Sequence, residues 1–293
     1  MSAEQRSGHG LIGVDLGGTS VKVGRVSGSL VEGRHTRLIS AAASQDVVLG
    51  EIFGAIETVF DNQVTGIGCG VPSVVDEATG IVYDVENIPS WRQVPLKDAI
   101  EDRFGVPAAV NNDANVFALG EHRFGRGRDF QHMVGITLGT GMGTGVILDS
   151  RLVTGGNCGV GEIGSIPHKG LTVEDFCAGR FFRREAGVTG ETLFEKARDG
   201  DRDAGVWFEK FGAELAFAVT VVLYAYDPQA ILFGGSISQA FDLFEGSLRR
   251  GLNSFDYPHI VDRLVIERST LSEAAVLGAA ALLPEYDQRS DRS

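Results

Sequence analysis

Two segments of this chain combine glycine with side chains that suit phosphate binding. The first is Asp15-Leu16-Gly17-Gly18-Thr19, where an apolar run ends at a carboxylate that is followed by two glycines and a hydroxyl. Glycines in a turn let the backbone approach a ligand closely, and their N–H groups can bind an anion. A carboxylate at that position suits a metal ion held through water. The segment predicts a phosphate-binding turn, and an ordinary tight turn with a solvated aspartate is the alternative.

The second segment repeats this plan about 120 residues later, and such self-similarity is typical of an internal duplication. Apolar strands within residues 133–149 flank a turn that contains Gly139, Thr140, Gly141 and Gly143. Two turns of this kind, facing one another, would hold a triphosphate from both sides. A further pair, Gly234-Gly235, follows an apolar strand and precedes a helix, which would let the backbone approach a nucleoside.

A polar cluster, Asn111-Asn112-Asp113-Ala114-Asn115, follows another apolar strand and is the candidate catalytic point. Asp113 could take the proton from a substrate hydroxyl as that hydroxyl attacks a phosphoryl group. Asn112 could hold neighbouring hydroxyls, since its amide both donates and accepts hydrogen bonds. Either residue could instead cap the helix that follows, and one side chain can do both.

Two glutamates and an asparagine are candidate ligands for a small polar substrate. Glu162 lies in a glycine-rich loop and Glu174 at the start of a helix. A carboxylate strengthens each hydrogen bond that it accepts from a sugar hydroxyl. Asn87 and Trp91 could contact the same ligand, but the local pattern favours an asparagine cap and a core tryptophan.

The apolar periodicity places these segments in an α/β fold. The apolar pattern of residues 11–40 predicts three strands. A helix and one more strand follow, so that the predicted order up to residue 72 is β-β-β-α-β. Ligands of open α/β sheets bind at the carboxyl ends of the strands, which is where the polar clusters lie. The remaining expected helices are 97–104, 114–124, 172–183, 208–226 and 273–282, and the remaining strands are 106–110, 230–233 and 264–266.

Composition narrows the class of protein. The 293 residues are 43% hydrophobic and 22% charged, which is typical of a soluble globular chain. A net charge of −13 argues against nucleic acid or an anionic membrane as partner. Three cysteines without a CxxC motif suit free thiols in the cytoplasm. Residues 1–9 lack the apolar core of a signal peptide. No apolar run reaches the roughly 18 residues that a membrane span needs. The charged tail after Pro284 is expected to be loose.

Taken in chain order, the motifs resemble the ROK family of sugar kinases from about residue 11 to residue 283. The matching segments are Asp15 to Thr19, Asn112 to Asn115 with Ala118-Leu119-Gly120-Glu121, Leu138 to Gly145, Gly161-Glu162-Ile163-Gly164, Phe233-Gly234-Gly235 and the closing Ala-Ala-Val-Leu-Gly-Ala-Ala. The resemblance implies an actin-like, hexokinase-type (ribonuclease H-like) fold with duplicated β-β-β-α-β-α domains. Residues 1–117 and 118–293 would form the two domains, with the active site in the cleft between them and the helix at about 273–283 packed back on the first.

The resemblance also implies a role for each matching residue. Asp113 matches the catalytic base. The residues that match the sugar side are Gly70, Asn87, Asn112, Glu162 and Glu174. Those that match the ATP side are Asp15, Gly17, Gly18, Thr19, Lys22, Thr140, Gly141, Gly143, Gly234 and Gly235. The implied reaction is ATP-dependent phosphorylation of a hexose with Mg²⁺, with glucose at its 6-hydroxyl as first choice and fructose, mannose or an N-acetylhexosamine as alternatives; a homodimer is usual for such proteins.

One segment departs from the family pattern. Many members have a histidine directly after the Gly-Glu-Ile-Gly segment and then a zinc knot of three cysteines, but this chain has Ser165 there and its nearby histidine is His168. Cys158 and Cys177 do not supply the knot's spacing, so we expect no structural zinc.

Two other classes of function stay open. One is a sugar-responsive repressor, which would carry a helix-turn-helix ahead of Asp15. The other is a non-catalytic or filament-forming actin-like ATPase.

Overall fold

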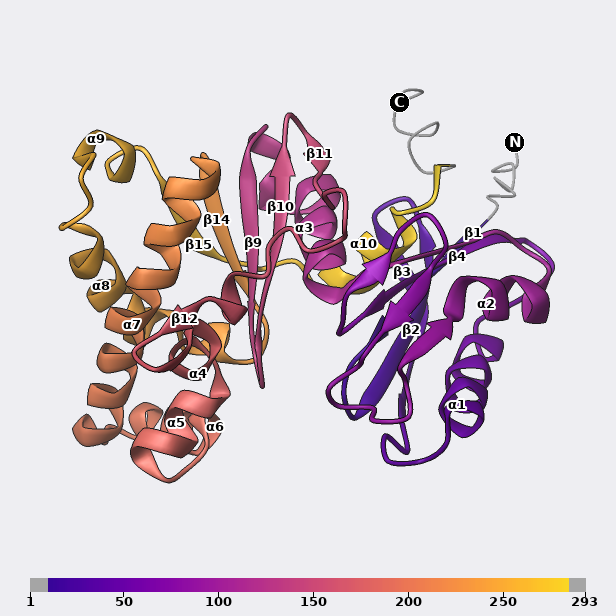
Figure 1. Ribbon diagram of the computed structural model, residues 1–293, viewed down its shortest axis with the longest axis horizontal. Helices are drawn as coiled ribbons and strands as arrows, with labels where there is room; N and C mark the ends of the chain where they lie inside the picture. Colours follow the sequence, from indigo (N-terminus) through magenta and orange to yellow (C-terminus); the bar gives the residue numbers. More distant parts are fainter. Residues whose placement is uncertain (1–9, 285–293) are drawn as a thin grey trace, which may run out of the picture. The chain divides into compact units, whose positions relative to one another are not determined.

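The computed structural model describes residues 10–284, and the expectations for residues 1–9 and for the tail beyond residue 284 lie outside that range. The described chain divides into two compact units (Figure 1). Unit 1 comprises residues 10–125, 154–159 and 271–284, and unit 2 comprises residues 126–153 and 160–270. The predicted boundary after residue 117 falls inside helix α3 (Asp113–Phe124), and unit 1 continues to Gly125. Within residues 10–284, no helix has the length and apolar character needed to cross a membrane.

Unit 1 is built on a five-stranded sheet. Its strands are β1 (Gly10–Leu16), β2 (Ser20–Ser27), β3 (Leu30–Leu38), β4 (Val64–Val71) and β8 (Ala108–Asn112). They run in the order β3-β2-β1-β4-β8, with β1, β2 and β3 antiparallel and with β4 and β8 parallel to β1. A small second sheet joins β5 (Val75–Asp76), β6 (Ile81–Tyr83) and β7 (Gln93–Pro95).

The two faces of the unit 1 sheet pack against different helices. Alternate apolar residues of β1 and β4 join a core with helices α1 (Gln45–Glu57) and α2 (Leu96–Phe104). The opposite face carries glycines, so helix α10 (Ala274–Ala280) lies directly on the backbone: a Cβ at Gly68 would fall 1.7 Å from the carbonyl oxygen of Ala279. Figure 1 shows α10 in yellow beside these strands. The closing helix of the chain therefore belongs to unit 1, next to α3.

Unit 2 repeats the sheet of unit 1. Its strands are β9 (Met133–Leu138), β10 (Met142–Leu148), β11 (Arg151–Leu152), β14 (Ala230–Gly234) and β15 (Val265–Arg268). Their order is β11-β10-β9-β14-β15, with a β9–β10 hairpin and with β14 and β15 parallel to β9. Two sheets with one topology confirm the predicted duplicated α/β fold. The third strand of the repeat is reduced to two residues.

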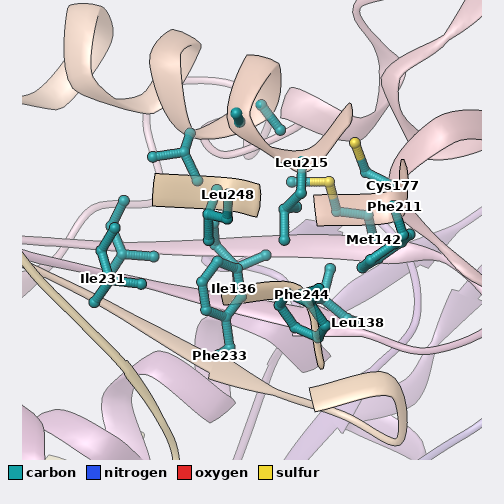
Figure 2. Close-up of a cluster of buried hydrophobic side chains, with 14 of the residues drawn as sticks. Ile136, Leu138, Met142, Cys177, Phe211, Leu215, Ile231, Phe233, Phe244 and Leu248 are labelled. Atoms are coloured by element: carbon teal, nitrogen blue, oxygen red, sulfur yellow. The ribbon is translucent and has the colours of Figure 1, made fainter. Parts of the chain in front are cut away.

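The core of unit 2 lies between its sheet and helices α7 (Arg202–Tyr226) and α8 (Phe241–Leu252). Figure 2 shows side chains of β9 and β14 meeting those of the two helices. The labelled members are Ile136, Leu138, Met142, Cys177, Phe211, Leu215, Ile231, Phe233, Phe244 and Leu248. Between β11 and β14, the chain also forms a β12–β13 hairpin (Pro167–His168 and Leu171–Thr172) and helices α4 (Val173–Cys177), α5 (Gly179–Ala186) and α6 (Gly190–Arg198). The single helix predicted over residues 172–183 is wrong, because the chain is extended at Ala178 and divides it into α4 and α5.

Candidate active site

The carboxyl ends of three parallel strands bring the predicted clusters of unit 1 together. In the β1–β4 ladder Asp15 pairs with Gly70, and in the β4–β8 ladder Gly70 pairs with Asn111. Neighbouring strands lie about 4.8 Å apart. The Asp15 segment, the loop after Gly70 and the asparagine cluster therefore occupy one edge of one sheet, which is where open α/β sheets bind ligands.

The Gly17–Thr19 turn is tied into unit 1 by its backbone and covered on one side by Asn87. The Gly17 N–H donates to the carbonyl of Ser20 at 2.8 Å, and the Ile39 N–H donates to that of Thr19 at 3.0 Å. A Cβ at Gly18 would lie 2.8 Å from Cβ of Asn87. Asn87 and Gly18 are far apart in the sequence, yet the fold places them in contact, as a shared ligand site would require.

Asp15 is mostly buried at the end of β1, with about a fifth of its side chain exposed. Burial raises the pKa of this carboxyl, Lys22 lowers it, and the negative charge of Glu273 raises it again. The Lys22 ammonium on the neighbouring strand lies 3.7 Å from Oδ2 of Asp15. Lys22 is therefore placed to balance the charge of Asp15, and its predicted contact with ATP stays a prediction.

Asn112 caps helix α3, as one of its two predicted roles required. Its side-chain oxygen accepts hydrogen bonds from the N–H groups of Ala114 and Asn115 at 2.9 and 3.3 Å. Its Nδ2 donates to the carbonyl of Ser73 at 3.1 Å, which links the cap to the loop after β4. Asp113 is the first residue of the helix, where a carboxylate is favoured by the helix dipole. Oδ1 of Asp113 also accepts a hydrogen bond from the Ala114 N–H at 2.8 Å. The cap thus fixes the start of the helix at which Asp113 lies.

Gly70 and Trp91 have packing roles that the structure makes explicit. A Cβ at Gly70 would lie 2.5 Å from Cγ2 of Val116, so the absence of a side chain lets α3 approach β4. Trp91 is fully buried in the core of unit 1, which confirms the interpretation as a core residue. The predicted sugar contacts of Gly70 and Asn112 stay predictions.

In unit 2 the second glycine turn lies beside the Gly234-Gly235 pair. The Gly139 N–H donates to the carbonyl of Gly141 at 2.9 Å, which closes the turn between β9 and β10. Gly235 has a φ of +81°, and a Cβ there would lie 2.3 Å from the carbonyl oxygen of Leu138. Glycine is the residue that fits such a position. Two segments predicted to serve the nucleotide are therefore adjacent in the same unit.

The negative charge of Glu174 acts on Glu162. Burial raises the pKa of Glu162, although its side chain still reaches solvent, and the negative charge of Glu174 raises it further. Glu174 accepts a hydrogen bond from the Met142 N–H at 2.9 Å and lies 3.3 Å from the Arg180 guanidinium. Arg180 is a residue that the sequence analysis missed, because nothing in its spacing marks it as the partner of a carboxylate.

The comparisons with known proteins agree with this geometry. The ROK family model matches residues 11–286. The chain belongs to the ROK family. A glucokinase of Thermotoga maritima is 34% identical over 310 aligned residues, which cover 94% of this chain and 97% of the relative. The crystal structure of a ROK family glucokinase from Streptomyces griseus in complex with glucose and AMPPNP superposes with a TM-score of 0.83 at 28% identity, covering 94% of this chain and 99% of that one.

The ROK family also contains regulators. A xylose repressor of Bacillus spizizenii is 25% identical over 94% of this chain, and the aligned part is 77% of the repressor. A repressor and a glucokinase thus match the same stretch of this ROK chain, and the glucokinase of Thermotoga maritima matches it at the higher identity.

The segment of this ROK chain that departs from the family pattern forms a small aromatic cluster. The His168 ring stacks on Phe217 with ring centroids 4.1 Å apart, and its Nε2 lies 3.3 Å from Oε2 of Glu214. Lys169 donates to both oxygens of the same glutamate at 2.7 Å. Over residues 10–284, no group of three or more His, Cys, Asp or Glu side chains is arranged to hold a metal ion. The expectation that the chain lacks structural zinc stays a prediction.

Proposed function

We propose that this chain transfers the γ-phosphoryl group of ATP to the 6-hydroxyl of a hexose, with glucose as the first candidate. Membership of the ROK family and the likeness to glucokinases identify it as an ATP-dependent sugar kinase. The observation that carries the assignment of the base is the register across β1, β4 and β8, which aligns Asp15 with Asn111. That register supports the proposal that the Asp113 carboxylate lies near the Gly17–Thr19 turn.

The proposed chemistry is general-base catalysis by Asp113. Its carboxylate accepts the proton of the sugar hydroxyl as the hydroxyl oxygen attacks the γ-phosphorus and the bond to the β-phosphate oxygen breaks. From unit 1, Asn112 and Asn87 are proposed to form hydrogen bonds with sugar hydroxyls. From unit 2, the carboxylates of Glu162 and Glu174 are proposed to accept hydrogen bonds from sugar hydroxyls. Preorganised N–H groups of the glycine turns stabilise the charge on the phosphoryl oxygens.

Mg²⁺ accompanies ATP in this proposal, and the residues present fit that ion. Mg²⁺ is usually bound by one or two carboxylates together with substrate phosphates and several waters. Asp15 supplies such a carboxylate beside the Gly17–Thr19 turn. When bound, the ion adds positive charge next to the phosphate oxygens. Lys22, with its ammonium 3.7 Å from Oδ2 of Asp15, keeps Asp15 from carrying an uncompensated buried charge.

Glucose is proposed because several relatives are glucokinases and because one similar solved structure contains glucose. Fructose, mannose and N-acetylhexosamines are the alternatives that a panel of sugars would separate. A repressor role is the second candidate, supported by the xylose repressor's match to 94% of this chain. A repressor would bind sugar without turning ATP over, so sugar-dependent ADP release distinguishes the two.

A homodimer in the cytoplasm is the expected assembly. In unit 2 a stripe of three exposed aromatic side chains supports a self-association surface: Phe217 and Tyr224 lie on one side of α7, and Tyr224 packs on the buried Phe255, which contacts the exposed Tyr257. An isologous contact through such a stripe would bury these rings in both copies. The free thiols Cys69, Cys158 and Cys177 fit a reducing compartment.

The test of the base is Asp113→Asn, with Asp98→Asn as matched control. Both aspartates lie in the first turn of a helix of unit 1, so each substitution removes the same charge from the same kind of position. Positioned general bases contribute about 10²- to 10⁴-fold. We therefore expect kcat to fall by that factor in Asp113→Asn, with the KM for ATP little changed, and to stay at the wild-type value in Asp98→Asn. Near-full turnover by Asp113→Asn would reject Asp113 as the base.

A further inference from the structure

The second glycine turn is held at both ends by one short segment of chain. At its start, the carbonyl of Gly139 accepts a hydrogen bond from the Gly179 N–H at 2.8 Å. At its end, the Met142 N–H donates to Oε2 of Glu174 at 2.9 Å. Glu174 lies in α4, and Gly179 is the first residue of α5. The turn is therefore held from outside the β9–β10 hairpin as well as by its own hydrogen bond from Gly139 to Gly141.

The Glu174 carboxylate fits closely against the turn. A Cβ at Gly141 would lie 2.5 Å from Oε2 of Glu174. On the other side, a Cβ at Gly164 would lie 3.5 Å from Cβ of Glu174 and 2.9 Å from the carbonyl oxygen of Met142. Backbone thus lies close to the glutamate on two sides, and about a fifth of its side chain is exposed.

Arg180 holds the other oxygen of the same carboxylate. Its Nη2 lies 3.3 Å from Oε1 of Glu174, and its Nη1 lies 3.9 Å from Oδ1 of Asp175. Asp175 is itself fixed by the capping box with Thr172 at the start of α4. A guanidinium in this position orients the glutamate, so that Oε2 faces the Met142 N–H. Hydrogen bonds to a carboxylate are roughly twice as strong as those between neutral groups.

We propose that Glu174 and Arg180 together are positioning residues for the nucleotide-side turn. The affinity for Mg-nucleotide then depends on this pair even when no sugar is present. The role is separate from the sugar contact proposed for Glu174, although it rests on the proposed function because it takes the Gly139–Gly143 turn as the nucleotide side. It also predicts that a change at Glu174 affects both substrates.

The test measures nucleotide affinity without sugar, by calorimetric titration of Mg-AMPPNP. Glu174→Ala removes the acceptor of the Met142 N–H and should raise the Kd about tenfold. Arg180→Met should raise it about threefold, since the guanidinium is 40% exposed and its charge is partly screened. Arg180→Lys keeps a charge and should restore most of the affinity. Arg183→Met, an exposed position on the same helix, is the matched control and should leave the Kd unchanged.

Hydrogen exchange of the Met142 amide gives a second readout that does not depend on catalysis. We expect exchange to become faster in Glu174→Ala and Arg180→Met and to stay at the wild-type rate in Arg183→Met. Variants that raise only the KM for sugar, with the nucleotide Kd and the Met142 exchange rate unchanged, would overturn the proposal. If the wild type phosphorylates no sugar while Met142 exchange still responds, the positioning role stands and the proposed function fails.

Discussion

The contact between Gly18 and Asn87 predicts that alanine at position 18 damages the first phosphate turn. An alanine Cβ there would lie 2.8 Å from Cβ, 3.1 Å from Cγ and 3.2 Å from Nδ2 of Asn87. Carbon atoms in good contact are about 3.5–4.0 Å apart, so the two segments must separate by about 0.7 Å or more. Overpacking of this kind typically costs about 1–3 kcal/mol.

The magnitude follows from where that cost falls. If the turn and the Asn87 segment share the strain, about 1–2 kcal/mol bears on the turn, which corresponds to a factor of 5 to 30 in an equilibrium constant. We expect the KM for Mg-ATP of Gly18→Ala to rise by that factor. The assay is ADP release at saturating hexose, with Mg-AMPPNP titration as an independent measure of affinity.

Gly17→Ala is the matched control, because it lies in the same turn and its Cβ would approach only the carbonyl oxygen of Ser20, at 3.4 Å. Neither glycine has a positive φ, so steric contact alone separates the two positions. In the double variant Gly18→Ala/Asn87→Gly the collision is gone, so the KM for ATP should return towards the wild-type value. The KM for sugar should be raised, because the proposed sugar contact of Asn87 is lost. Equal effects of Gly17→Ala and Gly18→Ala on the KM for ATP would refute the reasoning.

Three further predictions concern charge, metal and assembly. Burial and then the charge of Glu174 raise the pKa of Glu162, so the folded state favours the protonated carboxyl. Protonation of Glu162 therefore adds to the free energy of unfolding. This contribution is fully present below the pKa of Glu162 in the unfolded state and is lost as the pH rises through its pKa in the folded state. Glu162→Gln should therefore raise Tm at pH 7 by an amount that shrinks towards pH 4, and a pH-independent difference would contradict this assignment. Dialysis against EDTA followed by Mg²⁺ should leave turnover intact and elemental analysis should find substoichiometric zinc, whereas loss of activity restored only by zinc would show a structural metal. Phe217→Glu should shift the light-scattering mass from dimer towards monomer, and a wild type that is monomeric at all concentrations would exclude the dimer.

Much of the sheet arrangement could be predicted from the sequence, because the strand–glycine–strand pattern occurs twice and each copy leads to the same topology. Strands β1 and β9 are buried along almost their whole length, as their apolar runs predict, and β2 comes closer to an alternation of buried and exposed residues. The third strand of the first repeat, β3, has few apolar residues and is an exposed edge strand. The local pattern of apolar residues was sufficient to predict the strands whose positions depend on burial of those residues.

The helix break at Ala178 could not be predicted, because its cause is a contact distant in sequence. The Gly179 N–H donates to the carbonyl of Gly139 instead of continuing a helix, and the carbonyl of Asp175 accepts a hydrogen bond from Arg184 at 3.0 Å. The partnership of Glu174 with Met142 arises from the same tertiary arrangement. Helix α8, in contrast, carries Phe241, Phe244, Leu248 and Leu252 at helical spacing, and a helix after the Gly234-Gly235 pair was expected, although without bounds.

The most direct test of the central claim is the ³¹P NMR spectrum of the protein with Mg-ATP and glucose. We predict that the γ-phosphate resonance is replaced by that of a phosphomonoester on the 6-oxygen of the sugar, with one ADP formed for each ester. In Asp113→Asn this change should be about 10²- to 10⁴-fold slower. Inorganic phosphate as the only new species, formed equally with and without any hexose of the panel, would contradict the claim that this chain is a sugar kinase.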